Sequence, residues 1–252
     1  MPTNESERSV GAWVRRWWRA LLAELVATAL LVLLGIAAML PVGGEARPLS
    51  HPALTFGFIV VANVEIFGPV SGAHMNPALT LAALAARRLP AAAAAAAYAL
   101  AQLAGALLGF GALLALAPAA ATSGATHPAP GLSLAAALAL EATLTGTLAM
   151  LACAVWAAHD QQRPDRAVSL KFGLALAGLI YAGGPFTGAS LNPARSFAPA
   201  LFQGMTADHW VYWVGPLGGA LVGALVHRAL LAPRPETRAS RDALPLADKR
   251  EP

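Results

Sequence analysis

The chain has 252 residues, of which 57% are hydrophobic and only 12% are charged, and its mean hydropathy is +0.59. Soluble domains carry about 25% charged residues, so this composition excludes a disordered chain and argues against a soluble enzyme. Cys153 is the only cysteine and lies in an apolar run, which argues against a disulfide framework and a thiolate metal site. The composition therefore predicts a membrane protein, and we expect no metal or other cofactor.

Six apolar stretches are long enough to cross a bilayer, which takes about 20 helical residues. They cover residues 18–40, 52–68, 91–116, 132–158, 168–185 and 209–231. Two shorter apolar segments, 77–89 and 193–202, each follow a glycine-containing loop and begin at the proline of an Asn-Pro pair. We expect an all-α membrane protein with six transmembrane helices and two re-entrant half-helices.

The basic residues indicate the orientation of the chain. If the six helices alternate in direction, fifteen of the 17 Lys and Arg residues lie on one side, and Arg47 and Arg195 are the exceptions. Basic loops face the cytoplasm, so the segment 1–16 and the polar tail 233–252, which we expect to be disordered, are both predicted to be cytoplasmic. This asymmetry explains the basic charge without a nucleic-acid partner. The alanine- and arginine-rich composition favours a bacterial plasma (inner) membrane.

The two halves of the chain resemble each other. The segment SGAHMNPALT at 71–80 is similar to TGASLNPARS at 187–196, which places Asn76 and Asn192 116 residues apart. Two further correspondences have nearly the same offset: Glu24 with Glu141, and the run 101–109 with the run 215–223. Three ordered matches at nearly one offset indicate an internal duplication.

The duplication defines the domain organisation. We predict a first repeat over 17–116, an outer loop between the repeats over 117–131, and a second repeat over 132–232. Each repeat has three spanning helices, so the two repeats enter the bilayer in opposite senses. Such an inverted 3+3 repeat forms its site near the middle of the bilayer, where discontinuous helices meet.

Each Asn-Pro-Ala triplet has the chemistry of a helix start. Asn is a favoured N-cap, and Pro is favoured at the first helical position, where its missing N–H is not needed. Gly72 and Gly188 allow a sharp turn just before each triplet. The two half-helices should therefore begin at the bilayer centre, with the positive ends of their dipoles meeting there.

Through these two signatures and Arg195, residues 18–231 resemble the aquaporin (major intrinsic protein) family. The resemblance implies a passive channel for water with one pore per subunit, assembled as a homotetramer, and no enzymatic activity. It implies that the mid-pore is formed by Asn76, Pro77, Ala78, Asn192, Pro193 and Ala194. It further implies a row of backbone carbonyl acceptors along the pore, from Gly72, Ala73, His74, Met75, Gly188, Ser190 and Leu191.

The resemblance also implies an outer selectivity filter, which counting from the motifs assigns to Phe56, Ile180, Ala189 and Arg195. Water-selective members usually have His where this chain has Ile180, so the filter resembles that of broader channels for small neutral solutes. Ser196 after the arginine, in place of the Asp of glycerol channels, favours the water branch instead. We expect passage of water and of small uncharged solutes such as glycerol, urea, ammonia or metalloid hydroxides, with exclusion of protons and ions.

Glu24 and Glu141 are carboxylates inside apolar helices, and such groups are functional by default. Their equivalent positions in the two repeats favour structural support, in which each accepts backbone N–H bonds from a re-entrant loop. The alternative is a proton-coupled secondary transporter that uses both as proton sites. A scaffold protein without conduction fits poorly, because both triplets and Arg195 are intact.

Overall fold

The computed structural model describes residues 10–158 and 165–232. Its regular structure is helical, apart from one isolated bridge between Val42 and Glu45. The first repeat contains α1 (Val10–Ala37), α2 (Ser50–Ser71), α3 (Pro77–Ala85) and α4 (Ala92–Leu116), and a 3-10 helix, η2 (Pro118–Thr122), follows it. The second repeat contains α5 (Leu134–Ala157), α6 (Val168–Thr187), α7 (Pro193–Gln203) and α8 (Val211–Val226), which continues into a π-helical turn, η3 (His227–Leu231).

The predicted fold class is confirmed. Within the described ranges, the helices long and apolar enough to cross a membrane number 6: α1, α2, α4, α5, α6, and α8 together with η3. Helices α3 and α7, with 9 and 11 residues, are too short to cross. Each follows a short loop that begins at Gly72 or Gly188 and ends at an N-cap Asn, so they are the two half-helices.

Helix α1 is longer than the apolar stretch 18–40 at its N-terminal end. It begins at Val10, so residues 10–16 of the expected N-terminal segment are helical. The apolar stretch measures the thickness of the bilayer, whereas a helix continues for as long as its backbone bonds and packing allow. The rings of Trp13 and Trp17 lie next to each other at the start of α1, with centroids 6.3 Å apart and planes inclined by 34°. Residues 1–9 and the tail 233–252 lie outside the described residues.

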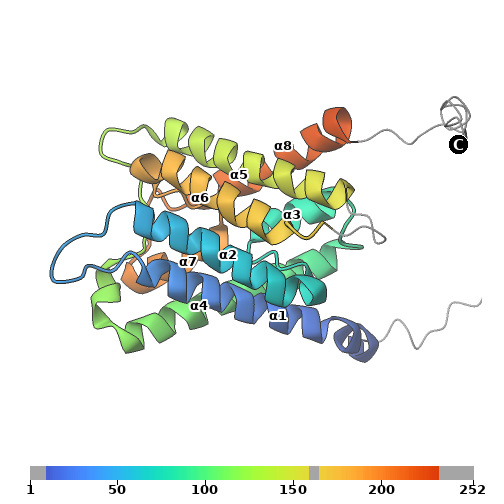
Figure 1. The fold of residues 1–252 in the computed structure, drawn as a ribbon, viewed down its shortest axis with the longest axis horizontal. Helices are drawn as coiled ribbons and strands as arrows, with labels where there is room; N and C mark the ends of the chain where they lie inside the picture. The colour runs from blue at the N-terminus through green and yellow to red at the C-terminus, as the bar shows by residue number, and fades with distance from the viewer. Residues whose placement is uncertain (1–9, 159–164, 233–252) are drawn as a thin grey trace, which may run out of the picture.

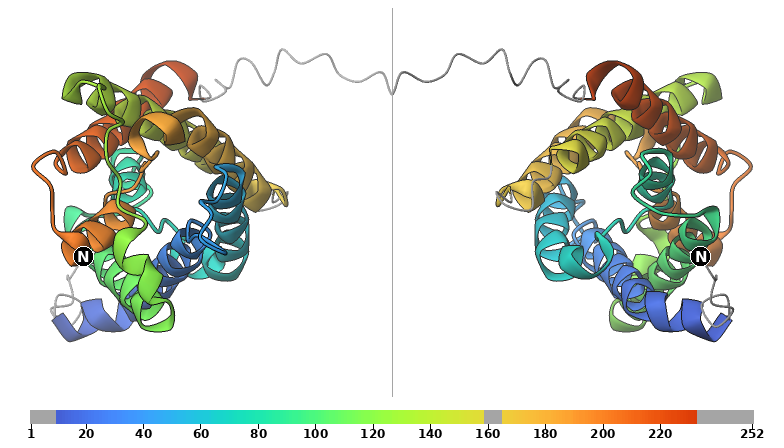
Figure 2. Two further views of the ribbon diagram at one scale, coloured as in Figure 1. Left: turned by 90° about the vertical axis from the view of Figure 1, so that its left-hand side faces the viewer. Right: turned by 90° about the vertical axis from the view of Figure 1, so that its right-hand side faces the viewer.

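The long helices run along the long axis of the molecule, and the short ones occupy the two halves of its interior (Figure 1). Helix α3 lies toward the end where α1 begins, and α7 lies toward the opposite end. The start of α1 and the end of α8 lie at the same end. Viewed along that axis, the helices are arranged in a ring (Figure 2).

Glycines allow equivalent helices of the two repeats to pack in the same way. A Cβ atom on Gly105 or Gly109 of α4 would overlap a backbone carbonyl of α1. In the second repeat, a Cβ atom on Gly219 or Gly223 of α8 would overlap a carbonyl of α5. Small residues permit such close approach between membrane helices. The duplicated sequence therefore produces a duplicated packing geometry.

Candidate functional site

The two Asn-Pro-Ala triplets start their half-helices as the sequence predicts. The side-chain oxygen of Asn76 accepts a hydrogen bond from the Ala78 N–H at 2.8 Å. Asn192 accepts from the N–H groups of Ala194 at 3.0 Å and Arg195 at 3.3 Å. Each Asn thus satisfies orphan donors at a helix start.

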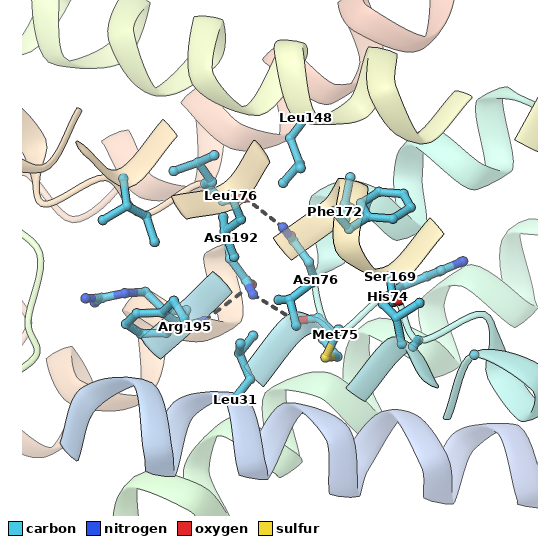
Figure 3. Close-up of a pocket in the computed structure, with 18 of the residues that line it drawn as sticks. Leu31, His74, Met75, Asn76, Leu148, Ser169, Phe172, Leu176, Asn192 and Arg195 are labelled. Carbon is cyan, nitrogen blue, oxygen red and sulfur yellow. Dashed lines mark hydrogen bonds between the residues drawn. The ribbon is translucent and has the colours of Figure 1, made fainter. Parts of the chain in front are cut away.

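The same two side chains also join the two repeats. Asn76 donates from Nδ2 to the Leu191 carbonyl at 2.7 Å, and Asn192 donates to the Met75 carbonyl at 2.8 Å. Figure 3 shows both amides in the middle of the cavity, with these bonds dashed. An amide nitrogen carries two hydrogens, so each Asn retains a second N–H for a molecule in the cavity, which both residues line.

The loops before the triplets have the same unusual backbone. Gly72 and Gly188 have φ of 89° and 77°, and Ala73 and Ala189 have φ of 49° and 44°. Met75 and Leu191 both have φ of 53°. Non-glycine residues rarely adopt such left-handed values, and each costs about 1–3 kcal/mol unless the surroundings impose it.

Glu24 imposes this backbone on the first loop. Its carboxylate accepts hydrogen bonds from the N–H groups of His74 at 2.8 Å and Met75 at 2.7 Å. Side chains complete its shell, because Ser71 donates at 2.7 Å and Gln102 at 2.8 Å. The carboxylate is fully buried and does not line the cavity.

Glu141 does the same for the second loop. It accepts from the N–H groups of Ser190 and Leu191, both at 2.9 Å, and from the Thr187 hydroxyl at 2.7 Å. It is also fully buried and away from the cavity wall. Each carboxylate thus binds the two backbone N–H groups that precede its Asn-Pro-Ala triplet.

A cavity of about 830 Å³ runs between the helices and contains most of the residues singled out from the sequence. Its wall includes Asn76, Asn192, Phe56, Ile180, Ala189, Arg195, Gly72, Ala73, His74, Met75, Gly188, Ser190 and Leu191. The Pro and Ala residues of the triplets differ from these: Pro77, Ala78, Pro193 and Ala194 are buried in helix packing and do not line it. They start the half-helices and pack them against the neighbouring helices.

Arg195 lies in the first turn of α7 with only 4% of its surface exposed. Its guanidinium donates from Nη1 to the Gly124 carbonyl at 2.5 Å and lies 3.5 Å from the Met39 sulfur through Nη2. The guanidinium carbon is 5.6 Å from the centre of the Phe56 ring, within cation–π range. These contacts hold a positive charge at one end of the cavity (Figure 3).

Met39 and Gly124 contact Arg195 but were not predicted as site residues from the sequence. Met39 and the inter-repeat loop at Gly124 position Arg195. At the opposite end, Glu65 accepts a hydrogen bond from Ser169, and His74 Nδ1 lies 3.2 Å from the Thr80 hydroxyl. No sequence signal marked Met39 or Gly124, because their contacts with Arg195 join residues 156 and 71 positions apart in the chain.

Residues 12–227 match the family model of the major intrinsic proteins. The chain belongs to the major intrinsic protein family. It is 40% identical to the lens fiber major intrinsic protein of Gallus gallus, over 90% of this chain and 87% of that protein. It is 35% identical to aquaporin-4 of Mus musculus, over 90% of this chain and 72% of that protein.

A solved structure shows the same fold. The aquaglyceroporin from Plasmodium falciparum superposes with a TM-score of 0.73 at 23% identity, covering 85% of this chain and 96% of that one. Members of this family are channels, so the chain is an integral multi-pass membrane channel and not an enzyme. Among residues 10–158 and 165–232, no cluster of three or more metal-binding side chains occurs.

Proposed function

We propose that this major intrinsic protein conducts water passively, together with small uncharged solutes such as glycerol, urea, ammonia or metalloid hydroxides. One observation supports this most directly: the Asn76 and Asn192 amides lie together in the middle of the cavity, and each has an N–H left for a passing molecule. The names of its relatives, aquaporin-4 and aquaglyceroporin, are consistent with both classes of permeant.

Exclusion of protons and cations is part of the proposal. A water molecule that accepts hydrogen bonds from both amides must direct its own hydrogens outward, which interrupts a chain of proton transfer. The two half-helices also begin at this place, and their positive dipole ends oppose a cation there. Arg195 adds a fixed positive charge nearer one mouth.

Phe56, Ile180, Ala189 and Arg195 form the proposed outer filter. All four line the cavity, and Arg195 packs beside the Phe56 ring. Ile180 and Ala189 offer no side-chain hydrogen bond, so part of this wall is apolar. The small apolar skeleton of a neutral solute loses less on leaving water against such a wall.

The environment of the carboxylates argues against a proton-coupled transporter. Glu24 and Glu141 are fully buried, lie outside the cavity wall, and have both oxygens engaged by backbone N–H donors. Neither carboxylate faces the cavity from which a transported proton would have to come, and neither has a free oxygen with which to take part in a proton cycle.

We further propose a homotetramer in a bacterial plasma (inner) membrane, with both termini in the cytoplasm. The family resemblance supports the tetramer, and the composition supports the location. For the orientation, the structure places the start of α1 and the end of α8 at one end, to which the positive-inside rule assigns the cytoplasm.

Proteoliposomes with purified protein test the proposal. Stopped-flow light scattering should show a higher osmotic water permeability than empty liposomes, while an internal pH dye reports a proton leak near background. A proton current that scales with the water flux would contradict the mid-pore mechanism. Uphill solute uptake driven by a pH gradient would favour the transporter instead.

A further inference from the structure

The wall of the cavity is built from pairs of residues that the duplication relates. Their offsets are 116 or 117 residues, and both members of each pair line the cavity: Leu31 and Leu148, Val60 and Leu176, Gly72 and Gly188, Met75 and Leu191, and Asn76 and Asn192. Figure 3 shows Leu31 and Leu148 on opposite walls and the two Asn side chains between them. Because the repeats are inverted, a residue at one end has its equivalent at the other end.

The four residues of the proposed outer filter have equivalents under the same offset of 116. They are Phe172 for Phe56, Val64 for Ile180, Ala73 for Ala189, and Leu79 for Arg195. All four equivalents line the cavity. We call Phe172, Val64, Ala73 and Leu79 the inner ring.

Backbone geometry supports this correspondence. Ala73 and Ala189 share a left-handed φ of 49° and 44°. The residues after Phe56 and Phe172 are Gly57 and Gly173, and these two glycines face each other where α2 packs on α6. A Cβ atom on Gly57 would come within 2.6 Å of the Gly173 carbonyl, and one on Gly173 within 2.5 Å of the Gly57 carbonyl. The two phenylalanines therefore occupy equivalent sites around this contact.

We propose that the inner ring is a second constriction of the channel, and that it selects permeants by their polarity. The two ends differ in one decisive substitution, because Leu79 occupies the position of Arg195. The outer filter can return hydrogen bonds to a solute through a guanidinium, whereas the four side chains of the inner ring offer none. Hydrophobic constrictions of this kind control permeation through the cost of removing water.

Two polar side chains at this end of the cavity wall already have protein partners. Glu65 is bonded to Ser169, and His74 lies beside the Thr80 hydroxyl. At the inner ring a solute meets backbone carbonyl acceptors, Ala73 among them, but no side-chain donor. The oxygens of a solute with several polar groups therefore lose water there without replacement, and unreplaced hydrogen bonds are costly. We expect the ring to lower the permeability to urea and glycerol more strongly than the permeability to water. A water molecule is small enough to stay hydrogen-bonded to the next water molecule in a single-file column.

The chain is well suited to a cysteine test, because its single cysteine, Cys153, is buried in α5 and absent from the cavity wall. In a Cys153→Ser background, Phe172→Cys or Leu79→Cys would be treated with methyl methanethiosulfonate in proteoliposomes. Modification should lower the water permeability by about threefold or more, since it narrows an apolar passage. The matched control is Phe186→Cys on the same helix as Phe172, because Phe186 is 50% exposed and lies outside the cavity wall.

A second variant tests polarity and does not depend on labelling. Phe172→Ala should raise the permeability to urea and glycerol by about fivefold, because a wider ring leaves more water on the solute. Its water permeability should change by less than about twofold. Phe186→Ala is the control, and monodisperse elution with an unchanged helical circular dichroism spectrum establishes folding for each variant.

This inference rests on the channel function proposed above, and the outcomes separate the two. If the unmodified protein conducts no water, the channel proposal fails and the inner ring falls with it. If the unmodified protein conducts water, but thiol modification at positions 172 and 79 and Phe172→Ala all leave water and solute fluxes unchanged, the inner ring is overturned and the channel stands.

Discussion

Glu24 and Glu141, 117 residues apart, each bind two consecutive backbone N–H groups just before an Asn-Pro-Ala triplet. Each also accepts from a hydroxyl at the end of the preceding helix, Ser71 for Glu24 and Thr187 for Glu141. The two loops carry three left-handed residues apiece. Two buried carboxylates therefore stabilise the strained backbone on which the middle of the cavity depends.

Replacing either carboxylate should weaken the fold. In Glu24→Gln or Glu141→Gln one acceptor becomes an amide donor that faces an N–H, and we expect a loss of about 3 kcal/mol in the free energy of unfolding. Thermal unfolding in detergent measures this. Glu65→Gln is the control, because Glu65 lines the cavity and does not hold a loop. Equal stability of all three variants would contradict the role of the two carboxylates.

Helix packing offers a sharp comparison between adjacent glycines of α8. A Cβ atom on Gly219 would overlap the Ala142 carbonyl of α5, whereas a Cβ atom on Gly218 meets nothing within 4 Å. Gly219→Ala should therefore destabilise the protein by about 1–3 kcal/mol through overpacking. Gly218→Ala should leave the unfolding temperature unchanged or raise it. A similar loss in both variants would mean that helix contact is not the cause.

Arg195→Val tests the outer filter. Removing the guanidinium eliminates a fixed positive charge and widens the space beside Phe56, so cations and larger solutes should pass more easily. Water permeability should remain within about twofold, because the mid-pore amides are intact. Ion conductance in planar bilayers and stopped-flow solute uptake measure the two effects. Arg228→Val is the control, since Arg228 is exposed near the end of α8. Unchanged selectivity in folded Arg195→Val protein would remove Arg195 from the filter.

Ile180→His should make the channel more selective for water. The imidazole narrows the opening and adds a polar group, so glycerol and urea permeability should fall by about tenfold while water falls by less than about threefold. Ile180→Leu keeps an apolar side chain of the same volume and should resemble the unmodified protein. If the unmodified channel already excludes every neutral solute, the broad-filter interpretation is wrong and only the water channel stands.

His209, just before α8, predicts a pH dependence of stability. Burial lowers the pKa of its imidazole from the ordinary value, opposed by Asp208, and the nearby His127 lowers it further. Its Nε2 accepts a hydrogen bond from the Trp213 indole at 3.1 Å, which requires the neutral form. As the pH falls, the His209 imidazole therefore takes up a proton at a higher pH in the unfolded chain than in the folded one. Its contribution to stability is complete above the ordinary pKa, about 6.5, and is lost as the pH falls below that value.

The measurement is the unfolding temperature between about pH 8 and pH 5. We expect it to decrease toward low pH, and we expect His209→Gln to reduce that decrease. His51→Gln is the control, because His51 is exposed at the start of α2. An identical pH profile for His209→Gln and the unmodified protein would exclude His209 as the titrating group.

Helix starts, apolar lengths and the duplication could be predicted from the sequence. Each depends only on neighbouring residues or on a constant spacing between equivalent residues of the two repeats. The Asn caps, the proline at the first helical position and the two-repeat organisation are of this kind. The apolar stretch 18–40 did not reveal that α1 begins at Val10, since apolar length reflects the thickness of the bilayer and not the length of the helix. The sequence also placed Phe56, Ile180, Ala189 and Arg195 together only through family resemblance.

The tertiary structure alone decided which groups meet across the chain. The bonds from Asn76 to Leu191 and from Asn192 to Met75 join loops of opposite repeats. The Gly124 carbonyl reaches Arg195 because the loop between the repeats folds back over the cavity. These contacts span 71 to 117 residues, and no local pattern encodes them. They arise because a carbonyl or guanidinium buried at this depth must find a partner, and the packing of the inverted repeats determines which partner is within reach.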